Sequence, residues 1–384
     1  MYDEVTNPQQ ETTGMLWTRR HCLETLVGAA AFWGLEPIAY STPTGQPNKF
    51  SIPGLYPGRV VAVENAACFS GGKYQAAPIR DTMRRGMAEL TGLPWKEAWR
   101  QFFQPGDAVG IKVNPVGTRA GVVSSPEVLH EIIAGLNAAG VSNKNIVVYE
   151  RYHSSLKEAN VASWLPAGVR LSYAAREWDE VQHGMDGYDP RHYVDLPLVL
   201  PGDSLKDPHA RRSYAARFIT TEVNKLVNLA VLKDHQAAGV TLCLKNLSHG
   251  LVNNVRRSHI NTELNACDKF IPAVVSMPVI RNKAVLHLID GIKGLYHAGP
   301  EGRPEFVWEH GTMYFGTDPV ALDRIGLSAI DAKRVAAGLK PVGEAAPDQF
   351  DQWLHKQPEH IAVAGAMGLG ESDEKKIDLR KIRL

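Results

Sequence analysis

Polar side chains follow four apolar runs of the sequence, at the positions where each run ends. In the first run, residues 109–115, Lys112 and Asn114 alternate to one side of the chain. A lysine within an apolar strand loses the hydration of its ammonium group on folding, which costs free energy. A bound anion can offset that cost by pairing with the ammonium. Lys112 is therefore a candidate catalytic residue, and Asn114 a candidate binding residue for a substrate or cofactor. The alternative is a lysine whose stem lies on apolar surface while its ammonium reaches water at the strand end.

The second run, residues 229–232, leads into His235, which is the strongest candidate for chemistry in the sequence. Neutral imidazole is a common metal ligand and an effective general base near neutral pH. A predicted helix follows and carries Lys245, a second candidate catalytic lysine, and Asn246, a candidate binding residue. For each of these residues taken singly, the alternative is a purely structural role.

A second histidine, His259, lies close to Arg257 in the sequence. Guanidinium groups bind carboxylates and phosphates through paired hydrogen bonds, so Arg257 is a candidate for binding an anion. His259 is a candidate metal ligand. A structural or exposed histidine is again the alternative.

The third and fourth runs place carboxylates and glycines near strand ends. Residues 287–289 lead to Asp290 and to a loop in which Gly291 and Gly299 permit close approach of the backbone to a ligand. His297 lies in the same loop. Asp318 directly precedes a proline and is a good helix N-cap, and capping alone is the alternative to a role in ligand binding.

Together these residue types suit a divalent metal beside an anionic substrate. Mixed histidine and aspartate ligation is typical of zinc, iron, manganese or nickel. The predicted metal ligands are His235, His259, Asp290, His297 and Asp318. Such a metal would polarise a carbonyl or activate water, while a histidine carries the proton and the lysines and amides hold a small anion. The competing hypothesis is a non-catalytic, cofactor-binding or redox-accessory protein that uses the same cleft.

The elements that must position these residues alternate between strand and helix. Strands are predicted at residues 59–64, 108–113, 146–149, 225–232, 284–289, 313–315 and 361–369. Helices are predicted at residues 78–90, 95–103, 126–139, 156–165, 238–246, 269–280 and 319–337. This order predicts an α/β fold with a mainly parallel, Rossmann-like sheet covered by helices on both faces. Residues 181–216 lack a sustained period and are interpreted as an irregular insertion or lid. In such sheets, ligands bind at the carboxyl ends of the strands.

The N-terminal segment differs from the rest of the chain. Arg19 and Arg20 precede an apolar stretch that is too short to span a bilayer, an order typical of a twin-arginine export signal. We therefore expect a periplasmic or otherwise exported protein that uses the twin-arginine machinery, with no stable membrane span in its mature form. The alternative is an amphipathic helix packed on the body, which Glu24 favours. The predicted division is a signal at 1–41, a linker at 42–58, a first α/β unit at 59–180, the insertion at 181–216 and a second unit at 217–384.

Composition excludes several classes of function. Lysine plus arginine, at 42, nearly cancels aspartate plus glutamate, at 41, so the positive field typical of nucleic-acid binding is missing. The four cysteines are widely spaced and form no C-x-x-C pair, so we expect no iron–sulfur cluster bound by this chain alone. No G-x-G-x-x-G follows an early strand, and no G-x-S-x-G elbow is present.

Five short motifs, in order, resemble those of the domain-of-unknown-function 362 family. They include Lys112 with Asn114, residues 233–235, Lys245 with Asn246, and residues 317–326. The fifth joins residues 290–291 to residues 299–300, and the resemblance extends over roughly residues 59–338. It is closest to the exported branch that lacks a ferredoxin-like cysteine module. Because the family is defined by unknown function, the resemblance implies the fold and the site region but no reaction.

Overall fold

The main sheet carries the apolar runs identified in the sequence. The computed structural model describes residues 39–40, 46–179 and 182–384. Within these residues, one sheet has the strand order β14-β2-β13-β12-β10-β5-β6-β7, and the short strand β11 pairs with the end of β10. These strands are β2 (Arg59–Glu64), β5 (Val109–Lys112), β6 (Ile146–Tyr149), β7 (Arg170–Ser172), β10 (Lys225–His235), β11 (Gly239–Val240), β12 (Ala284–Leu295), β13 (Val307–Gly316) and β14 (Asp378–Arg383).

Most neighbouring strands in this sheet are parallel. β10 pairs in parallel with β5 and β12, β6 pairs in parallel with β5 and β7, and β14 pairs in parallel with β2. β13 is antiparallel to both β12 and β2, so the sheet is mixed. Every residue of β5 and β6 is buried, as expected for strands covered on both faces. The predicted α/β class with a mainly parallel sheet is confirmed.

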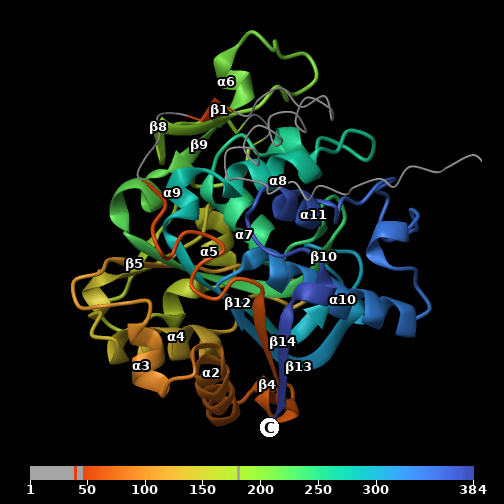
Figure 1. Ribbon diagram of the computed structural model, residues 1–384. Coiled ribbons are helices and arrows are strands. Elements are labelled where there is room, and N and C mark those ends of the chain that lie inside the picture. Colours follow the sequence, from red (N-terminus) through yellow and green to blue (C-terminus); the bar gives the residue numbers. More distant parts are fainter. Residues whose placement is uncertain (1–38, 41–45, 180–181) are drawn as a thin grey trace, which may run out of the picture. The chain divides into compact units, whose positions relative to one another are not determined.

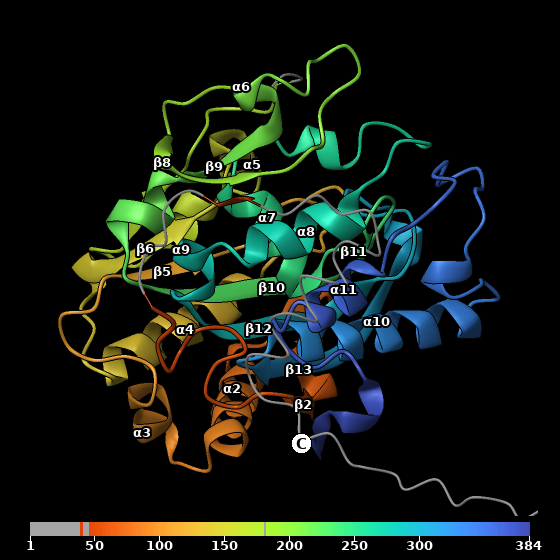
Figure 2. The ribbon, with the colours of Figure 1, turned by 45° about the horizontal axis from the view of Figure 1, so that its top comes forward.

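Helices cover both faces of the sheet (Figures 1 and 2). The α-helices of the described residues are α2 (Ala76–Thr91), α3 (Trp95–Arg100), α4 (Pro126–Ala138), α5 (His153–Glu158), α6 (Pro208–Arg211), α7 (Leu242–Leu251), α8 (Cys267–Val275), α9 (Pro278–Arg281), α10 (Pro319–Ala336) and α11 (His360–Ala366). α2, α3 and α4 pack on one face, and α7 and α8 lie over the other. None of the helices described is long and apolar enough to cross a membrane.

One helix and four strands differ from the sequence-based expectation. The predicted strand at residues 361–369 is wrong, because His360–Ala366 forms α11, which packs against α8. The charged segment after it contains β14, whose exposed charges suit an edge strand. Within the predicted insertion, β8 (Tyr188–Asp195) and β9 (Arg212–Ala216) pair antiparallel, and β1 (Ala39–Tyr40) adds to β8. Apart from β1, the predicted export signal lies outside the described residues.

Candidate functional site

A pocket of about 580 Å³ lies at the carboxyl ends of β5 and β10, where parallel sheets bind ligands. Strand ends, the turn after β10, α7 and the segment after it supply its walls. Six residues singled out in the sequence line it, namely Lys112, Asn114, His235, Lys245, Asn246 and His259. Further lining residues include Glu150, Arg151, Lys233, His249, Glu301 and Trp353. The lining thus holds three lysines, two arginines and three histidines against two carboxylates, Glu150 and Glu301.

The Lys112 ammonium is held from three sides. Nζ donates to the Glu150 carboxylate at 2.8 Å, to the Asn246 amide oxygen at 3.0 Å and to the Val113 carbonyl at 2.6 Å. Only 1% of Lys112 is exposed, and burial lowers its pKa although Glu150 opposes the shift. Gly250 permits this arrangement, because a Cβ at that position would lie 2.1 Å from Cε of Lys112. The charge of Lys112 is thus neutralised inside the protein.

Lys233, at the end of β10, faces only neutral acceptors. Its Nζ donates to the Asn114 amide oxygen at 2.9 Å and to the Val116 carbonyl. Burial lowers the pKa of Lys233 to about 7. The sequence reasoning passed over this lysine in favour of its neighbour His235, although both follow the same strand.

Of the three lysines that line the pocket, Lys245 has the fewest hydrogen bonds to its side-chain nitrogen. Lys245 lines the pocket, and its Nζ makes no hydrogen bond or ion pair with another described residue. Burial lowers its pKa to about 8; Cys267 opposes this shift, and the charges of Arg151 and Lys112 add to it. Its helix, α7, is fixed by the Asp323 carboxylate, which accepts from the backbone N–H groups of Cys243 at 2.7 Å and Leu244 at 2.9 Å.

The hydrogen bonds of His235 determine which ring nitrogen carries the proton. Its Nδ1 accepts from the backbone N–H groups of Ala237 at 3.1 Å and Ala238 at 3.2 Å. Nδ1 must therefore hold a lone pair, and the neutral ring carries its proton on Nε2. Burial lowers the pKa of His235 well below its ordinary value, so the ring is neutral at pH 7. It presents an N–H donor, which does not suit metal ligation through Nε2.

His259 has the opposite tautomer, and the Ser258 hydroxyl sets it. Ser258 Oγ lies 2.7 Å from the Val255 carbonyl oxygen, which can only accept. The same Oγ must then accept from Nε2 of His249 at 3.0 Å and from Nδ1 of His259 at 2.9 Å. Nε2 of His259 therefore bears a lone pair. Burial lowers the pKa of His259 to about 3, and its ring centroid lies 5.7 Å from that of His235.

The match to known families covers this site. Residues 109–328 match a domain of unknown function (DUF362), a span that includes more than half of the chain. The chain belongs to the DUF362 family. The match begins with β5 and ends in α10, so it is narrower than the span of residues 59–338 expected from the motifs. No curated protein matches the chain.

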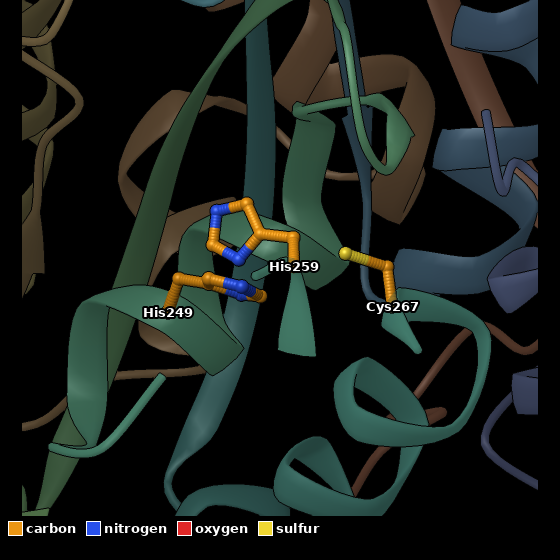
Figure 3. A group of neighbouring side chains, drawn as sticks. All are labelled: His249, His259 and Cys267. Carbon is orange, nitrogen blue, oxygen red and sulfur yellow. The ribbon is translucent and has the colours of Figure 1, made fainter. Parts of the chain in front are cut away.

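Within the DUF362 region, three buried or half-buried side chains could hold a metal ion. Ligand atoms of His249, His259 and Cys267 all lie within 4.8 Å of one another. Figure 3 shows the Cys267 sulfur directed toward the His259 side chain, with His249 below it. Burial raises the pKa of the Cys267 thiol to about 12, and Lys245 opposes this shift. The sequence analysis did not predict His249 and Cys267 as metal ligands, because neither belongs to a compact ligand motif.

A second group, Asp234, His297 and Asp351, lies partly beyond the DUF362 match. Lys356 occupies it as an internal cation, with Nζ 2.5 Å from the Asp351 carboxylate and 3.8 Å from that of Asp234. Nε2 of His297 lies 2.8 Å from the Asp348 carboxylate. These side chains already balance one another's charge. We therefore interpret the group as a structural ion-pair network and not as a metal site.

The other candidate residues in the DUF362 chain lie outside the pocket lining and have local partners. The Asp290 carboxylate accepts from the Ser125 backbone at 2.9 Å and from its hydroxyl at 2.7 Å. Asp318 caps α10 and accepts four backbone N–H groups in all. Arg257 donates to backbone carbonyls and to Ser213. Gly299 donates its N–H to Asp234 at 2.9 Å. The predicted five metal ligands do not converge, because only His235 and His259 line the pocket.

Gly291 lies inside β12, opposite Thr312 of β13. A Cβ at this position would lie 2.5 Å from the Thr312 carbonyl oxygen. The glycine therefore permits close contact between two strands of the sheet, and it is not among the residues that line the pocket.

Proposed function

We propose that this chain is an enzyme that binds a small organic anion in the β5–β10 pocket and transfers a proton at that anion. The observation that carries the proposal is the buried Lys245, whose ammonium has no partner among the described residues. Lys233 beside it faces neutral acceptors only. Buried ammonium groups without carboxylate partners favour an anionic ligand, which would supply the missing charge.

The balance of charge along the walls supports the same ligand class. Lys112 is neutralised by Glu150, and Glu301, the other carboxylate of the lining, is exposed. The Arg151 guanidinium donates to the Val252 carbonyl at 3.2 Å, and it makes no ion pair with a described carboxylate. A cavity of about 580 Å³ accommodates a small carboxylate or phosphate ester together with water.

The two tautomers supply a hydrogen-bond acceptor and a hydrogen-bond donor in the same pocket as Lys245. His259 Nε2 offers a lone pair that can accept a hydrogen bond, although its pKa of about 3 makes the ring a weak base. His235 Nε2–H offers a hydrogen bond to developing negative charge. A Lys245 pKa of about 8 lies close enough to neutral pH for its amine to accept a proton and its ammonium to return one. Lys245 and the two rings therefore suit transfer of a proton at a carbon or oxygen beside a carboxylate.

The pH dependence of anion binding tests the role of the lysines. The anion binds the ammonium forms, and these forms disappear as pH rises through the pKa values of Lys233, about 7, and Lys245, about 8. We expect the affinity for phosphate and for pyruvate to be highest near pH 6 and to fall roughly tenfold or more by about pH 9. Titration calorimetry in buffers of different ionisation enthalpy should detect proton uptake near pH 7.5.

The absence of binding by phosphate, lactate and pyruvate at any of these pH values would contradict the proposal. Binding without chemistry is the alternative, a non-catalytic or redox-accessory protein. Proton NMR in D₂O separates the two, because an enzyme of the proposed class exchanges a carbon-bound proton of one of these acids for deuterium. The exchange should be lost in Lys245→Met, whereas a protein that only binds these acids gives no exchange in the wild type or in the variant.

A divalent metal is a second candidate, favoured by the proximity of His249, His259 and Cys267. Thiolate and imidazole ligands suit zinc, iron or nickel better than manganese. When bound, the metal would act as a Lewis acid beside the anion. It would have to displace a serine hydroxyl from His249, whose Nδ1 contacts Ser248 and whose Nε2 contacts Ser258. Metal analysis of protein purified without added metal tests this, and stoichiometric metal should disappear in Cys267→Ala.

We further propose that the chain belongs to the exported branch of the DUF362 family, which lacks the ferredoxin-like module. It would reach the periplasm through the twin-arginine machinery. The support is the sequence Thr18-Arg19-Arg20 before an apolar stretch. Replacing both arginines with lysine should hold the protein in the cytoplasm. If the location of the protein does not change, the export signal is contradicted and the interpretation of this segment as an amphipathic helix is favoured.

A further inference from the structure

We infer that Lys245 is a nucleophile that forms a reversible imine with the carbonyl carbon of a small 2-oxo acid bound in the β5–β10 pocket. The inference rests on the proposed function and narrows it, because it specifies the substrate class and a covalent step. It is carried by the positions and partners of the three lysines that line the pocket.

Those three lysines differ in whether their nitrogen is available. Lys112 is fixed by three acceptors, one of them a carboxylate, and Lys233 is fixed by two. Lys245 has no hydrogen-bond partner among the described residues. When its side chain is deprotonated, no described group therefore competes for the nitrogen lone pair. Burial, with the charges of Arg151 and Lys112, lowers the pKa of Lys245 to about 8 although Cys267 opposes the shift, so a fraction of the side chain is free amine at near-neutral pH. Desolvated lysines next to other cations are the type used for imine chemistry.

The surroundings provide what a 2-oxo acid requires. The ammonium of Lys233, which has no carboxylate partner, can pair with the acid's carboxylate. The N–H that His235 presents can donate to the carbonyl oxygen as negative charge develops there. An aldehyde without a carboxylate would lack the first of these contacts.

The step balances without an oxidant or reductant. The nitrogen lone pair of Lys245 attacks the carbonyl carbon, the electrons of the C=O bond move to oxygen, and one proton of the attacking nitrogen passes to that oxygen to give the carbinolamine. The second nitrogen proton passes to the carbinolamine hydroxyl, which leaves as water while the nitrogen lone pair forms the C=N bond. The products are one C=N bond and one water molecule, and hydrolysis reverses both changes.

Reductive trapping tests the inference on the full chain. The protein is incubated with pyruvate and sodium cyanoborohydride, and the product is measured by intact mass and peptide mapping. We expect one adduct per chain, on Lys245, which disappears in Lys245→Arg and remains in Lys269→Arg, a change at an exposed lysine. With pyruvate at concentrations that saturate binding at each pH, trapping should increase from about pH 6 to about pH 8, because the fraction of Lys245 that is free amine rises over that range.

Binding measured separately distinguishes failure of the inference from failure of the proposed function. If pyruvate binds but no adduct forms, or if the adduct maps to another lysine, the imine is overturned and anion binding stands. If phosphate binds and pyruvate does not, the substrate class is overturned. If neither binds, both proposals fail. Mapping of the wild-type adduct decides the site even if Lys245→Arg does not fold.

Discussion

Replacing Glu150 with alanine is expected to lower the free energy of unfolding by about 3–5 kcal/mol, because it leaves the Lys112 ammonium buried without its counter-ion. The two groups lie 2.8 Å apart, and their side chains are 1% and 8% exposed. The remaining acceptors of Lys112, an amide and a backbone carbonyl, are neutral and cannot replace the carboxylate. Urea denaturation followed by circular dichroism measures the change.

An exposed ion pair of the same chain is the matched control. Arg383 lies 2.9 Å from Glu64, but their side chains are 79% and 47% exposed, so Glu64→Ala should cost less than about 1 kcal/mol. The double variant Lys112→Met with Glu150→Ala should recover most of the loss, because it removes the unpaired charge. Equal destabilisation by Glu150→Ala and Glu64→Ala would show that the buried pair does not hold the pocket wall.

Replacing Lys245 with methionine should weaken phosphate and pyruvate binding about 10- to 100-fold, the effect of one lost charge-assisted hydrogen bond in a buried site. Stability should be unchanged or slightly higher, since the ammonium has no partner among the described residues and burial lowers its pKa to about 8. Titration calorimetry gives the affinity, and thermal melts of the same samples give the stability.

Lys269→Met is the control for this prediction, because Lys269 is an exposed lysine that is not part of the pocket lining. It should retain wild-type affinity. If Lys245→Met also binds both anions as tightly as the wild type, the ammonium of Lys245 does not contact the ligand. The proposed function would then lose the observation that carries it.

Local patterning predicted much of this arrangement. The strands at residues 59–64 and 146–149 have the predicted bounds, because short β-branched runs between turn residues permit little else. Lys112, Asn114 and His235 line one pocket because they lie at or just beyond the carboxyl ends of β5 and β10, which are neighbouring parallel strands. The meeting of parallel strand ends at one edge of the sheet thus predicted that residues more than a hundred positions apart in the sequence lie close together.

Strand length and local hydrogen bonding were beyond the sequence reasoning. The strand predicted to end at residue 289 continues to Leu295, so Asp290 lies within β12 and pairs with Met313 of β13. Its carboxylate accepts a hydrogen bond from the backbone N–H of Ser125, the residue before α4. Sequence alone does not indicate which N–H groups will donate to a given carboxylate. The tautomer of His259 depends likewise on one hydroxyl, that of Ser258, whose orientation only the assembled fold provides.

Trp353 joins the pocket wall from a segment that lies after the DUF362 match, with its ring centroid 6.3 Å from that of His259. The lysines and imidazoles are contributed by the matched region, whereas this indole is contributed by a stretch between α10 and α11. Replacing Trp353 alone would therefore alter the shape offered to a ligand without removing any of the charged groups. Shape at this wall and charge are contributed by different parts of the chain, which makes Trp353 a practical starting point for redesigning ligand choice.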